Sequence, residues 1–189
     1  IHYVDAEDDF HEVFDGGIIR AAQQLKAEGK IRHIGMSSHN PVVARMAVET
    51  GLIDVLMFSI NPAYDLQPAE VDIYSMFEGD TYAAARHNID PERERLYELC
   101  ARCDVGIDVM KVYGGGDLLS VDNSPFGTAM TPVQAIDYAL ARPAVAAVMV
   151  GCKNMAEIAE ATDWCDATPE ERDYASVLNR LDRFSWQGH

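Results

Sequence analysis

The sequence contains few basic residues and no long apolar segment. Lysine and arginine number 15 against 31 aspartate and glutamate residues, so the formal net charge is -16. No basic cluster offers the positive surface that nucleic acid or an anionic membrane would need. No uncharged apolar run is long enough to span a bilayer, and the first residues lack the pattern of a signal peptide. We therefore expect a cytoplasmic protein with neither nucleic-acid nor membrane partners.

Cysteine is scarce too, with four residues: Cys100, Cys103, Cys152 and Cys165. The first two form a C-x-x-C pair, but the surrounding segment has a helical pattern, and no second Cys or His pair completes a zinc site. The six histidines show no H-x-H or H-x-x-x-H spacing. We expect reduced thiols rather than a disulfide framework, and no metal ligands in this chain.

Apolar residues still make up 48% of the chain and charged residues 24%, the balance of a globular domain with a sizeable core. Apolar runs typical of buried strands recur at 1–4, 31–36, 53–60, 105–110 and 144–150. Amphipathic segments separate these runs, so strands and helices are expected to alternate. Such an alternation favours a parallel sheet covered by helices, either an open doubly wound sheet or a (β/α) barrel.

Helix ends are marked by short polar and glycine signals. A capping side chain stands before a proline at four expected helix starts: Asn40-Pro41, Asp90-Pro91, Thr131-Pro132 and Thr168-Pro169. Gly29 and Gly51 follow helical runs and can take the left-handed conformation that ends a helix. From Thr168 onward the pattern predicts one capped amphipathic helix.

Two strand-to-helix connections are long, at roughly 62–89 and 113–130, so a site is expected at the carboxyl ends of the strands. Five strands in 189 residues fall short of the eight strands and ~250 residues of a closed barrel. Either the sheet is open and doubly wound, or part of a barrel is missing. The start within an apolar run favours a partial (β/α)8 TIM barrel. We expect one domain over 1–189, with about the last five βα units, parallel strands and outer helices, and with N-terminal strands and a C-terminal extension outside this sequence.

The run GKIRHIGMSSHN is the most informative segment. It contains the end of an expected helix, then an expected strand, and then a cluster of polar residues at the carboxyl end of that strand. It resembles the G-K-I-R-x-I-G-x-S signature of aldo/keto reductases. Four further segments resemble, in order, that family's fourth, sixth, seventh and eighth strands: IHYVD, DVLMFSINPAYD, VGIDVMKVYGGG and AVAAVMVGCKN.

The resemblance implies an oxidoreductase that transfers hydride between NAD(P)H and a small carbonyl or alcohol substrate. The family's catalytic set is Tyr, Lys, Asp and His, and His2 matches the histidine. The other three belong to strand-loop units that this sequence lacks, so the isolated chain is expected to be inactive. Without the resemblance, a histidine in an apolar strand reads as a core residue.

The resemblance also implies contacts to the nicotinamide end of the cofactor. Ser37 matches a serine that hydrogen-bonds the carboxamide, and Ser38 replaces the asparagine usual beside it. Phe58 stands where a carboxamide-binding glutamine is common. Met110 replaces a tyrosine on which the nicotinamide ring often stacks, and its sulfur can pack on a ring.

Two further segments match the family's phosphate contacts. Lys111 and Tyr113 lead into Gly114 and Gly115, a loop that could bring backbone N–H groups and a cation to a pyrophosphate. A plain flexible turn is the alternative for this glycine run.

The last strand ends in Gly151, Cys152, Lys153 and Asn154, where Asn154 caps a helix. Glu157 replaces an arginine that grips the 2′-phosphate of NADPH in many members. It would favour NAD(H) over NADP(H) by accepting from a ribose hydroxyl, and it also suits a capping box.

The long insertion after residue 62 and the tail resemble a subgroup in which an iron–sulfur segment follows at this point. This chain has no four-cysteine iron–sulfur motif, so such a cluster could lie only beyond its C-terminal end. Four aromatic residues of the insertion could line a substrate pocket or anchor the loop to the barrel: Tyr64, Tyr74, Phe77 and Tyr82.

Two other functions remain open. Phe58, Met110 and Glu157 stand where the family often has a Gln, a Tyr and an Arg that contact the cofactor. The loss of these contacts allows a non-catalytic barrel that binds a nucleotide as a redox sensor or scaffolds a partner. Strand-end histidines, His33 and His39, with Asp108 could instead suggest a metal-dependent TIM-barrel hydrolase. Open sheet edges are expected to cause self-association if the chain folds alone.

Overall fold

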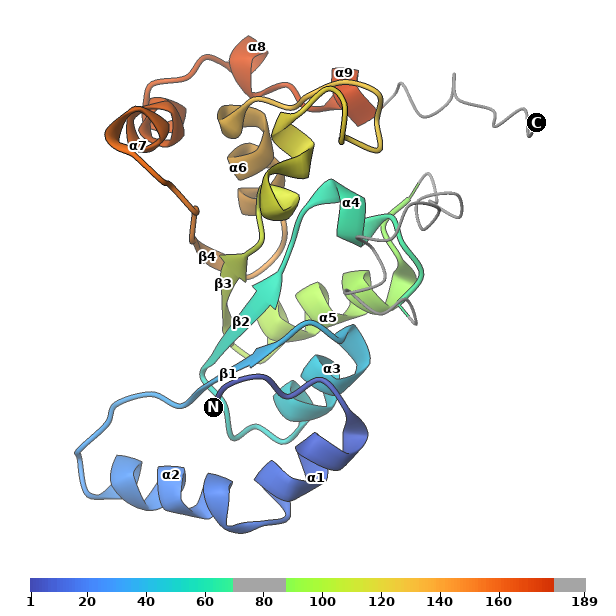
Figure 1. Ribbon diagram of the computed structural model, residues 1–189. Coiled ribbons are helices and arrows are strands. Elements are labelled where there is room, and N and C mark those ends of the chain that lie inside the picture. The colour runs from blue at the N-terminus through green and yellow to red at the C-terminus, as the bar shows by residue number, and fades with distance from the viewer. Residues whose placement is uncertain (70–87, 179–189) are drawn as a thin grey trace.

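A parallel four-stranded sheet forms the centre of the molecule (Figure 1). The computed structural model describes residues 1–69 and 88–178. The strands are β1 (Gly35–Ser38), β2 (Val55–Ser59), β3 (Gly106–Met110) and β4 (Val145–Val148), adjacent in that order. All three pairings are parallel, and an irregularity in the β3–β4 register lies between Ile107 and Asp108. Because neighbours in sequence are neighbours in the sheet, the open doubly wound alternative does not apply.

Helices precede, separate and follow the strands. In chain order they are α1 (Glu7–Phe14), α2 (Gly17–Ala27), α3 (Pro41–Glu49), α4 (Pro62–Asp65), α5 (Pro91–Arg102), α6 (Pro132–Leu140), α7 (Met155–Thr162), α8 (Pro169–Arg172) and α9 (Ala175–Leu178). Short 3-10 helices join them in the described ranges: η3 (Gly114–Leu119) follows β3, and η4 (Asp163–Cys165) follows α7. The expected fold class, part of a (β/α) barrel with outer helices, is confirmed.

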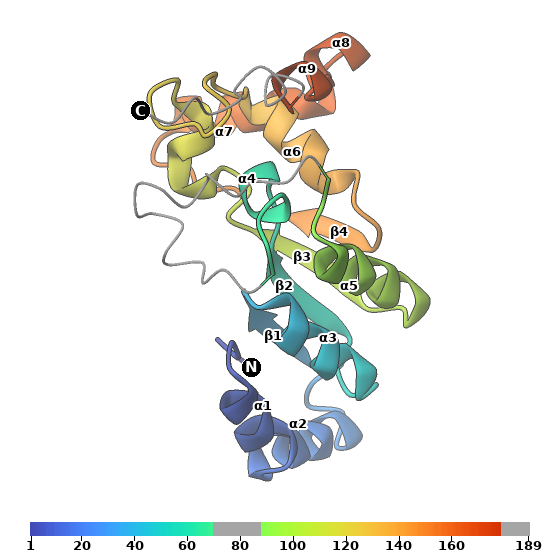
Figure 2. The same cartoon turned by 90° about the vertical axis from the view of Figure 1, so that its right-hand side faces the viewer.

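The two faces of the sheet differ in what covers them. Helices α3 and α5 pack on each other and lie over one face, called here the outer face (Figure 2). Side chains that point to it are fully buried: Leu56, Phe58 and Ile107. The opposite, inner face carries the register row Ser37, Met57 and Asp108. In Figure 1 this face looks left, between α2 and α7, and no described element crosses it.

The expected strand at residues 1–4 is only partly realised. The Ile1 amino group donates to Gly35 O at 2.7 Å, and Ser37 N donates to Ile1 O at 2.9 Å, which is one step of a parallel ladder beside β1. Tyr3 then adopts a φ of 63°, a conformation that breaks an extended strand. The segment therefore lies where a first strand would lie but is not one.

The predicted helix ends are confirmed. Asn40, Asp90, Thr131 and Thr168 each accept a hydrogen bond from the first turn of the helix that follows. Asn61 caps α4 in the same way, before Pro62. Gly29 and Gly51 have φ values of 70° and 67°, as helix-ending glycines require.

Two other expectations need correction, and a third concerns residues that the structure does not describe. The strand expected at 31–36 is β1, which begins at Gly35 rather than at 31 and includes Ser37 and Ser38. The predicted tail helix is two short helices, α8 and α9, because Asp173 adopts an extended conformation between them. The insertion residues Tyr74, Phe77 and Tyr82 lie outside the described residues.

A buried polar cluster ties the carboxyl end of the sheet to three helices. The Asp65 carboxylate of α4 is fully buried and accepts from Tyr97 Oη at 2.6 Å and Tyr138 Oη at 2.9 Å. Arg93 Nη1 lies 3.3 Å from Asp65 Oδ1 and donates to Ser59 O at 3.0 Å. These bonds link α4 to α5, α6 and β2.

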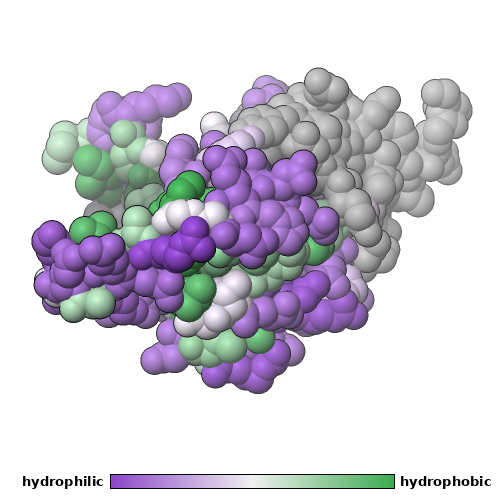
Figure 3. Space-filling model, turned by 90° about the horizontal axis from the view of Figure 1, so that it is seen from below, coloured by the Kyte–Doolittle hydropathy of each residue, from purple (hydrophilic) through white to green (hydrophobic). Residues whose placement is uncertain are grey.

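The surface formed by α1 and α2 is mainly hydrophilic with scattered apolar side chains (Figure 3). Ile19 is the buried residue of α2, whereas Ile18 and Leu25 are exposed. No helix in the described ranges, 1–69 and 88–178, is long and apolar enough to cross a membrane.

Candidate functional site

A pocket of about 460 Å³ lies between the loops that follow β3 and β4. Its wall consists of Lys111, Val112, Tyr113, Gly115, Gly116, Leu119, Met149, Gly151, Cys152, Lys153 and Glu157. The pocket thereby brings together much of the predicted cofactor set: Lys111, Tyr113, Gly115, Gly151, Cys152, Lys153 and Glu157. Both loops leave the carboxyl ends of neighbouring strands, which is where parallel α/β folds place their sites.

Backbone conformation shapes the β3 side of the pocket. Lys111 follows β3 and has a φ of 62°. Its carbonyl accepts from Asn61 Nδ2 at 2.8 Å, and this bond fixes the turn to the segment after β2. Gly115 and Gly116 have φ values of 73° and 109°, which side-chain-bearing residues rarely adopt. The glycine run is thus required by the turn, and it leaves the backbone open on the pocket side.

Tyr113 is buried in the pocket wall without a partner for its hydroxyl. The residue is 9% exposed, and within the described part of the chain its Oη has no hydrogen-bond partner. Burial, with the nearby Cys152 and Glu160, raises the pKa of Tyr113 to about 12. The phenol therefore stays protonated at neutral pH and can donate to an acceptor.

The β4 side of the pocket is built on the N-terminus of α7. Asn154 Oδ1 accepts from Glu157 N at 3.0 Å, the predicted cap. Glu157 folds back over the same turn, accepting from Lys153 N at 2.6 Å and from Asn154 Nδ2 at 3.0 Å. The Glu157 carboxylate therefore already serves as the anion at this helix end.

The remaining predicted residues lie at the same edge of the sheet but do not line the pocket: His2, Ser37, Ser38, Phe58, Met110, Gly114 and Asn154. Exposed His2 lies alongside Ser37, whose Oγ accepts from Tyr3 N at 2.8 Å. Ser38 is fully buried, and its hydroxyl donates to Asp5 Oδ1 at 3.1 Å. The Ser38 hydroxyl therefore faces a protein carboxylate rather than open space.

Asp5 organises this end of β1. Its Oδ1 accepts from His39 N at 2.7 Å, and its Oδ2 lies 2.9 Å from His39 Nδ1. Burial acts to raise the pKa of Asp5, but the hydrogen bonds and charge of His39, with the Ser38 hydroxyl, hold the pKa below its usual value. An ionised carboxylate accepts only, so Nδ1 of His39 carries a proton and donates it in this hydrogen bond. Sequence reasoning missed Asp5, because it stands at the start of an acidic run with nothing to mark it.

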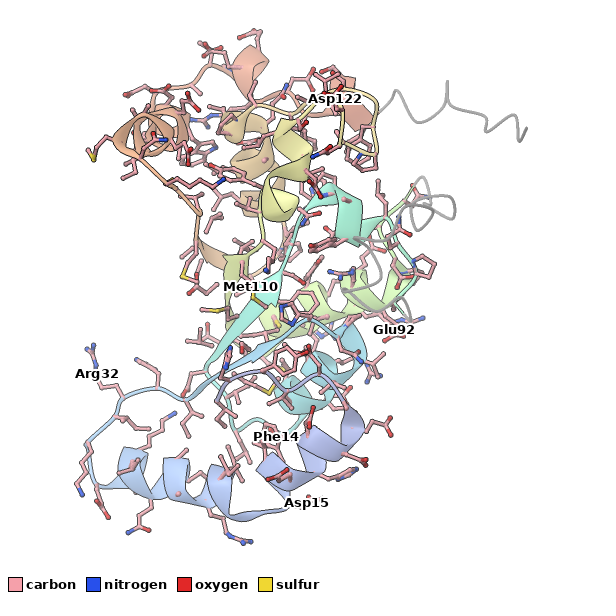
Figure 4. The ribbon with its side chains drawn as sticks, viewed as in Figure 1. Phe14, Asp15, Arg32, Glu92, Met110 and Asp122 are labelled. Carbon is pink, nitrogen blue, oxygen red and sulfur yellow. The ribbon has the colours of Figure 1, made fainter. Side chains whose placement is uncertain are left out.

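Phe58 does not lie on the face of the sheet that carries Ser37, where a contact to the carboxamide was expected. Phe58 is fully buried on the outer face, where Arg93 lies 5.1 Å above its ring. Met57 is the β2 residue paired with Ser37 on the inner face. Strand alternation is the signal that separates them, because the outer-face residues recur at every second position. Met110 lies at the end of β3 (Figure 4), paired with Ser59.

His33, His39 and Asp108 do not form a joint site, since His39 pairs with Asp5. Across the described ranges, no group of three or more His, Cys, Asp or Glu side chains is placed to hold a metal ion. The four cysteines are free, with Cys100 buried, Cys152 half-buried, and Cys103 and Cys165 exposed. Tyr64 is buried within α4.

Comparison with known proteins gives a structural likeness. No protein-family model matches the chain, and no curated protein matches it in sequence. The holo form of aldo-keto reductase AKR11C1 from Bacillus halodurans is similar over 87% of this chain and 55% of its own, with 21% identity and a TM-score of 0.59. The apo form of the same protein is similar over 87% of this chain and 56% of its own, with 21% identity and a TM-score of 0.57. The chain thus spans about half the length of these structures, and its fold is that of part of an aldo-keto reductase barrel.

Proposed function

We propose that the protein containing this chain is an oxidoreductase that binds NAD(H) or NADP(H) and transfers hydride to or from a small carbonyl or alcohol substrate. The observation that carries the proposal is the pocket in which Lys111, Gly115 and Lys153 meet from the loops after two neighbouring strands. The fold, shared with part of an aldo-keto reductase, supports the same class of reaction.

The chemistry of the pocket suits a dinucleotide. Gly115 and Gly116 present bare backbone that a diphosphate can approach closely, and Lys111 and Lys153 supply positive charge. The unpartnered Tyr113 hydroxyl is a donor for a ligand oxygen. A volume of about 460 Å³ is in the usual range of cofactor sites.

When bound, the nicotinamide supplies or accepts the hydride. In this chain, Lys111 and Lys153 would hold the diphosphate, and Ser37 would orient the carboxamide. His2, beside Ser37, would hydrogen-bond the substrate oxygen on which charge develops. The acid–base tyrosine and lysine have no match here, so the 189-residue chain alone is expected to be inactive. Sustained carbonyl reduction by that chain would refute this part of the proposal.

Glu157 leads us to expect NADH as the preferred cofactor. Its carboxylate would repel a second phosphate at the α7 end of the pocket and can accept from a ribose hydroxyl. Fluorescence titration of the intact protein should give a lower Kd for NADH than for NADPH. Glu157→Gln keeps an acceptor for Lys153 N but removes the charge, so the preference should shrink by about tenfold.

Glu170→Gln is the matched control, because it removes the same charge at an exposed position on α8, outside the pocket wall. It should leave the ratio of the two Kd values near that of the unmodified protein. Tighter binding of NADPH by the unmodified protein would contradict the role given to Glu157. Absence of binding by both nucleotides would refute the proposed function.

A second candidate is a non-catalytic nucleotide-binding barrel that senses redox state or scaffolds a partner. Its support is that exposed His2 does not line the pocket and that the Glu157 carboxylate already occupies donors at the α7 N-terminus. Turnover of carbonyl substrates by the intact protein would decide for the enzyme. Nucleotide binding without any turnover would decide for the sensor.

A further inference from the structure

One wall of the pocket contains a thiol to which the proposed function gives no chemical role. Cys152 is half-buried and stands in the β4–α7 turn, between Gly151 and Lys153. The other cysteines are placed differently: Cys100 is fully buried, and Cys103 and Cys165 are exposed outside the pocket. Burial raises the pKa of Cys100 to about 12, which keeps it an unreactive thiol.

A second observation concerns Tyr113 in the same pocket wall. Tyr113, which is 9% exposed, lines the same pocket, and its hydroxyl lacks a hydrogen-bond partner in the described ranges. Native proteins seldom leave a buried hydroxyl unpaired, because it loses the hydrogen bonds that it makes in water. Tyr113 lies close enough to Cys152 for the thiol to affect its pKa. The thiol and the free donor thus share one end of the pocket.

The surroundings also suit an anionic reagent such as a peptide disulfide. Lys111 and Lys153 line the same cavity and supply positive charge to its wall. Partial exposure gives a small reagent access to Cys152. The cavity of about 460 Å³ is small enough that a tripeptide-sized group attached to its wall would occupy much of it.

We propose that Cys152 is a modification site at which a low-molecular-weight disulfide closes the dinucleotide pocket. The inference rests on the proposed function, since it concerns the same pocket. The Cys152 thiolate attacks one sulfur of the disulfide, a new S–S bond forms to Cys152, and the old S–S bond breaks. The leaving thiolate takes up the proton that Cys152 lost, so no further oxidant is needed. A dithiol reductant reverses the step.

The test treats the intact protein with oxidised glutathione and compares NADH binding before and after. Mass spectrometry should find one glutathionyl group on Cys152, and the Kd for NADH should rise by about tenfold or more. Dithiothreitol should restore the original Kd. NADH present during treatment should slow modification of Cys152 but not of exposed Cys103.

Two variants make the comparison specific. In Cys152→Ser the ratio of treated to untreated Kd should be one, whatever Kd that variant has. In Cys103→Ser, which removes an exposed thiol outside the pocket, the ratio should remain as large as in the unmodified protein.

The possible results distinguish failure of the Cys152 modification from failure of NADH binding itself. If untreated protein does not bind NADH, the proposed function fails and this inference with it. If NADH binds but Cys152 is not modified, or is modified without weakening binding, the inference alone is overturned. Equal protection of Cys103 and Cys152 by NADH would also overturn it, because it would place the effect outside the pocket.

Discussion

At the scale of single residues, the end of β1 depends on one carboxylate. Asp5 accepts three hydrogen bonds, from Ser38 Oγ, His39 N and the His39 ring, and so fixes the N-terminal segment beside β1. Its partners are charged or strongly polar, and its side chain is mostly shielded from water. Such bonds contribute more to stability than those of an exposed carboxylate.

We predict that Asp5→Asn lowers the free energy of unfolding at pH 7 by about 1–3 kcal/mol. The pKa of Asp5 is lowered in the folded protein, so its contribution is present above the unfolded pKa and is lost as pH falls through the folded value, below 3.8. Urea unfolding of both proteins at pH 7 and at lower pH should therefore show a shrinking difference.

Asp122→Asn is the control for this change, because Asp122 is exposed in the loop before α6 (Figure 4). It should alter stability by less than about 0.5 kcal/mol. A difference between the Asp5 variant and the unmodified protein that stayed constant down to pH 3 would contradict the role given to Asp5.

At the scale of elements, the Asp65 cluster determines how α6 is attached. Tyr138 of α6 and Tyr97 of α5 donate to opposite oxygens of a carboxylate that is fully buried. Burial raises the pKa of Asp65, against the opposing effect of Arg93 and the two phenols. The carboxylate is therefore costly to bury and depends on each of its donors.

We predict that Tyr138→Phe destabilises the protein by about 1.5–3 kcal/mol, because it leaves Asp65 Oδ2 without its phenol donor while changing the packing little. The matched control is Tyr174→Phe, whose hydroxyl accepts from Arg142 Nη2 at 3.2 Å in a partly exposed position. The control should cost less than about 1 kcal/mol in thermal or urea unfolding. Equal losses in the two variants would show that the buried carboxylate does not depend on Tyr138.

At the scale of the whole molecule, the sheet is incompletely covered. The described part of the chain leaves β4 at one edge, with Ala146 and Ala147 exposed, and leaves the inner face without a covering element. Arg32 extends from the segment before β1 on this open side (Figure 4). Unpaired strand edges offer hydrogen-bonding groups to other chains.

We therefore predict that the isolated 189-residue chain self-associates. Light scattering over a dilution series should show a mass that increases with concentration. Ala146→Lys should reduce the association, because a charge on an edge strand opposes pairing. Ala101→Lys, at an exposed position on α5, adds the same charge away from the edge and should have no such effect. A monomer at all concentrations would refute the prediction.

The sequence by itself determined the local structure. Asn40-Pro41 and Thr131-Pro132 begin helices because the cap and the proline act within one turn, and Gly51 ends a helix because its φ is a local property. The alternation of apolar runs and amphipathic segments was enough to predict a parallel sheet with outer helices. It also placed a site at the carboxyl ends of the strands.

Only the tertiary structure decided which residues meet. Alternation within β2 separates Phe58 from Met57, but only the register between strands places Phe58 under α5 and Met57 beside Ser37. Asp5 can accept hydrogen bonds from His39, 34 positions away in sequence, only when the two segments lie side by side in the folded chain. The pocket likewise exists only because the loops after β3 and β4 leave adjacent strands. Contacts between distant segments depend on the packing of the whole sheet, so they appear only when the chain is folded.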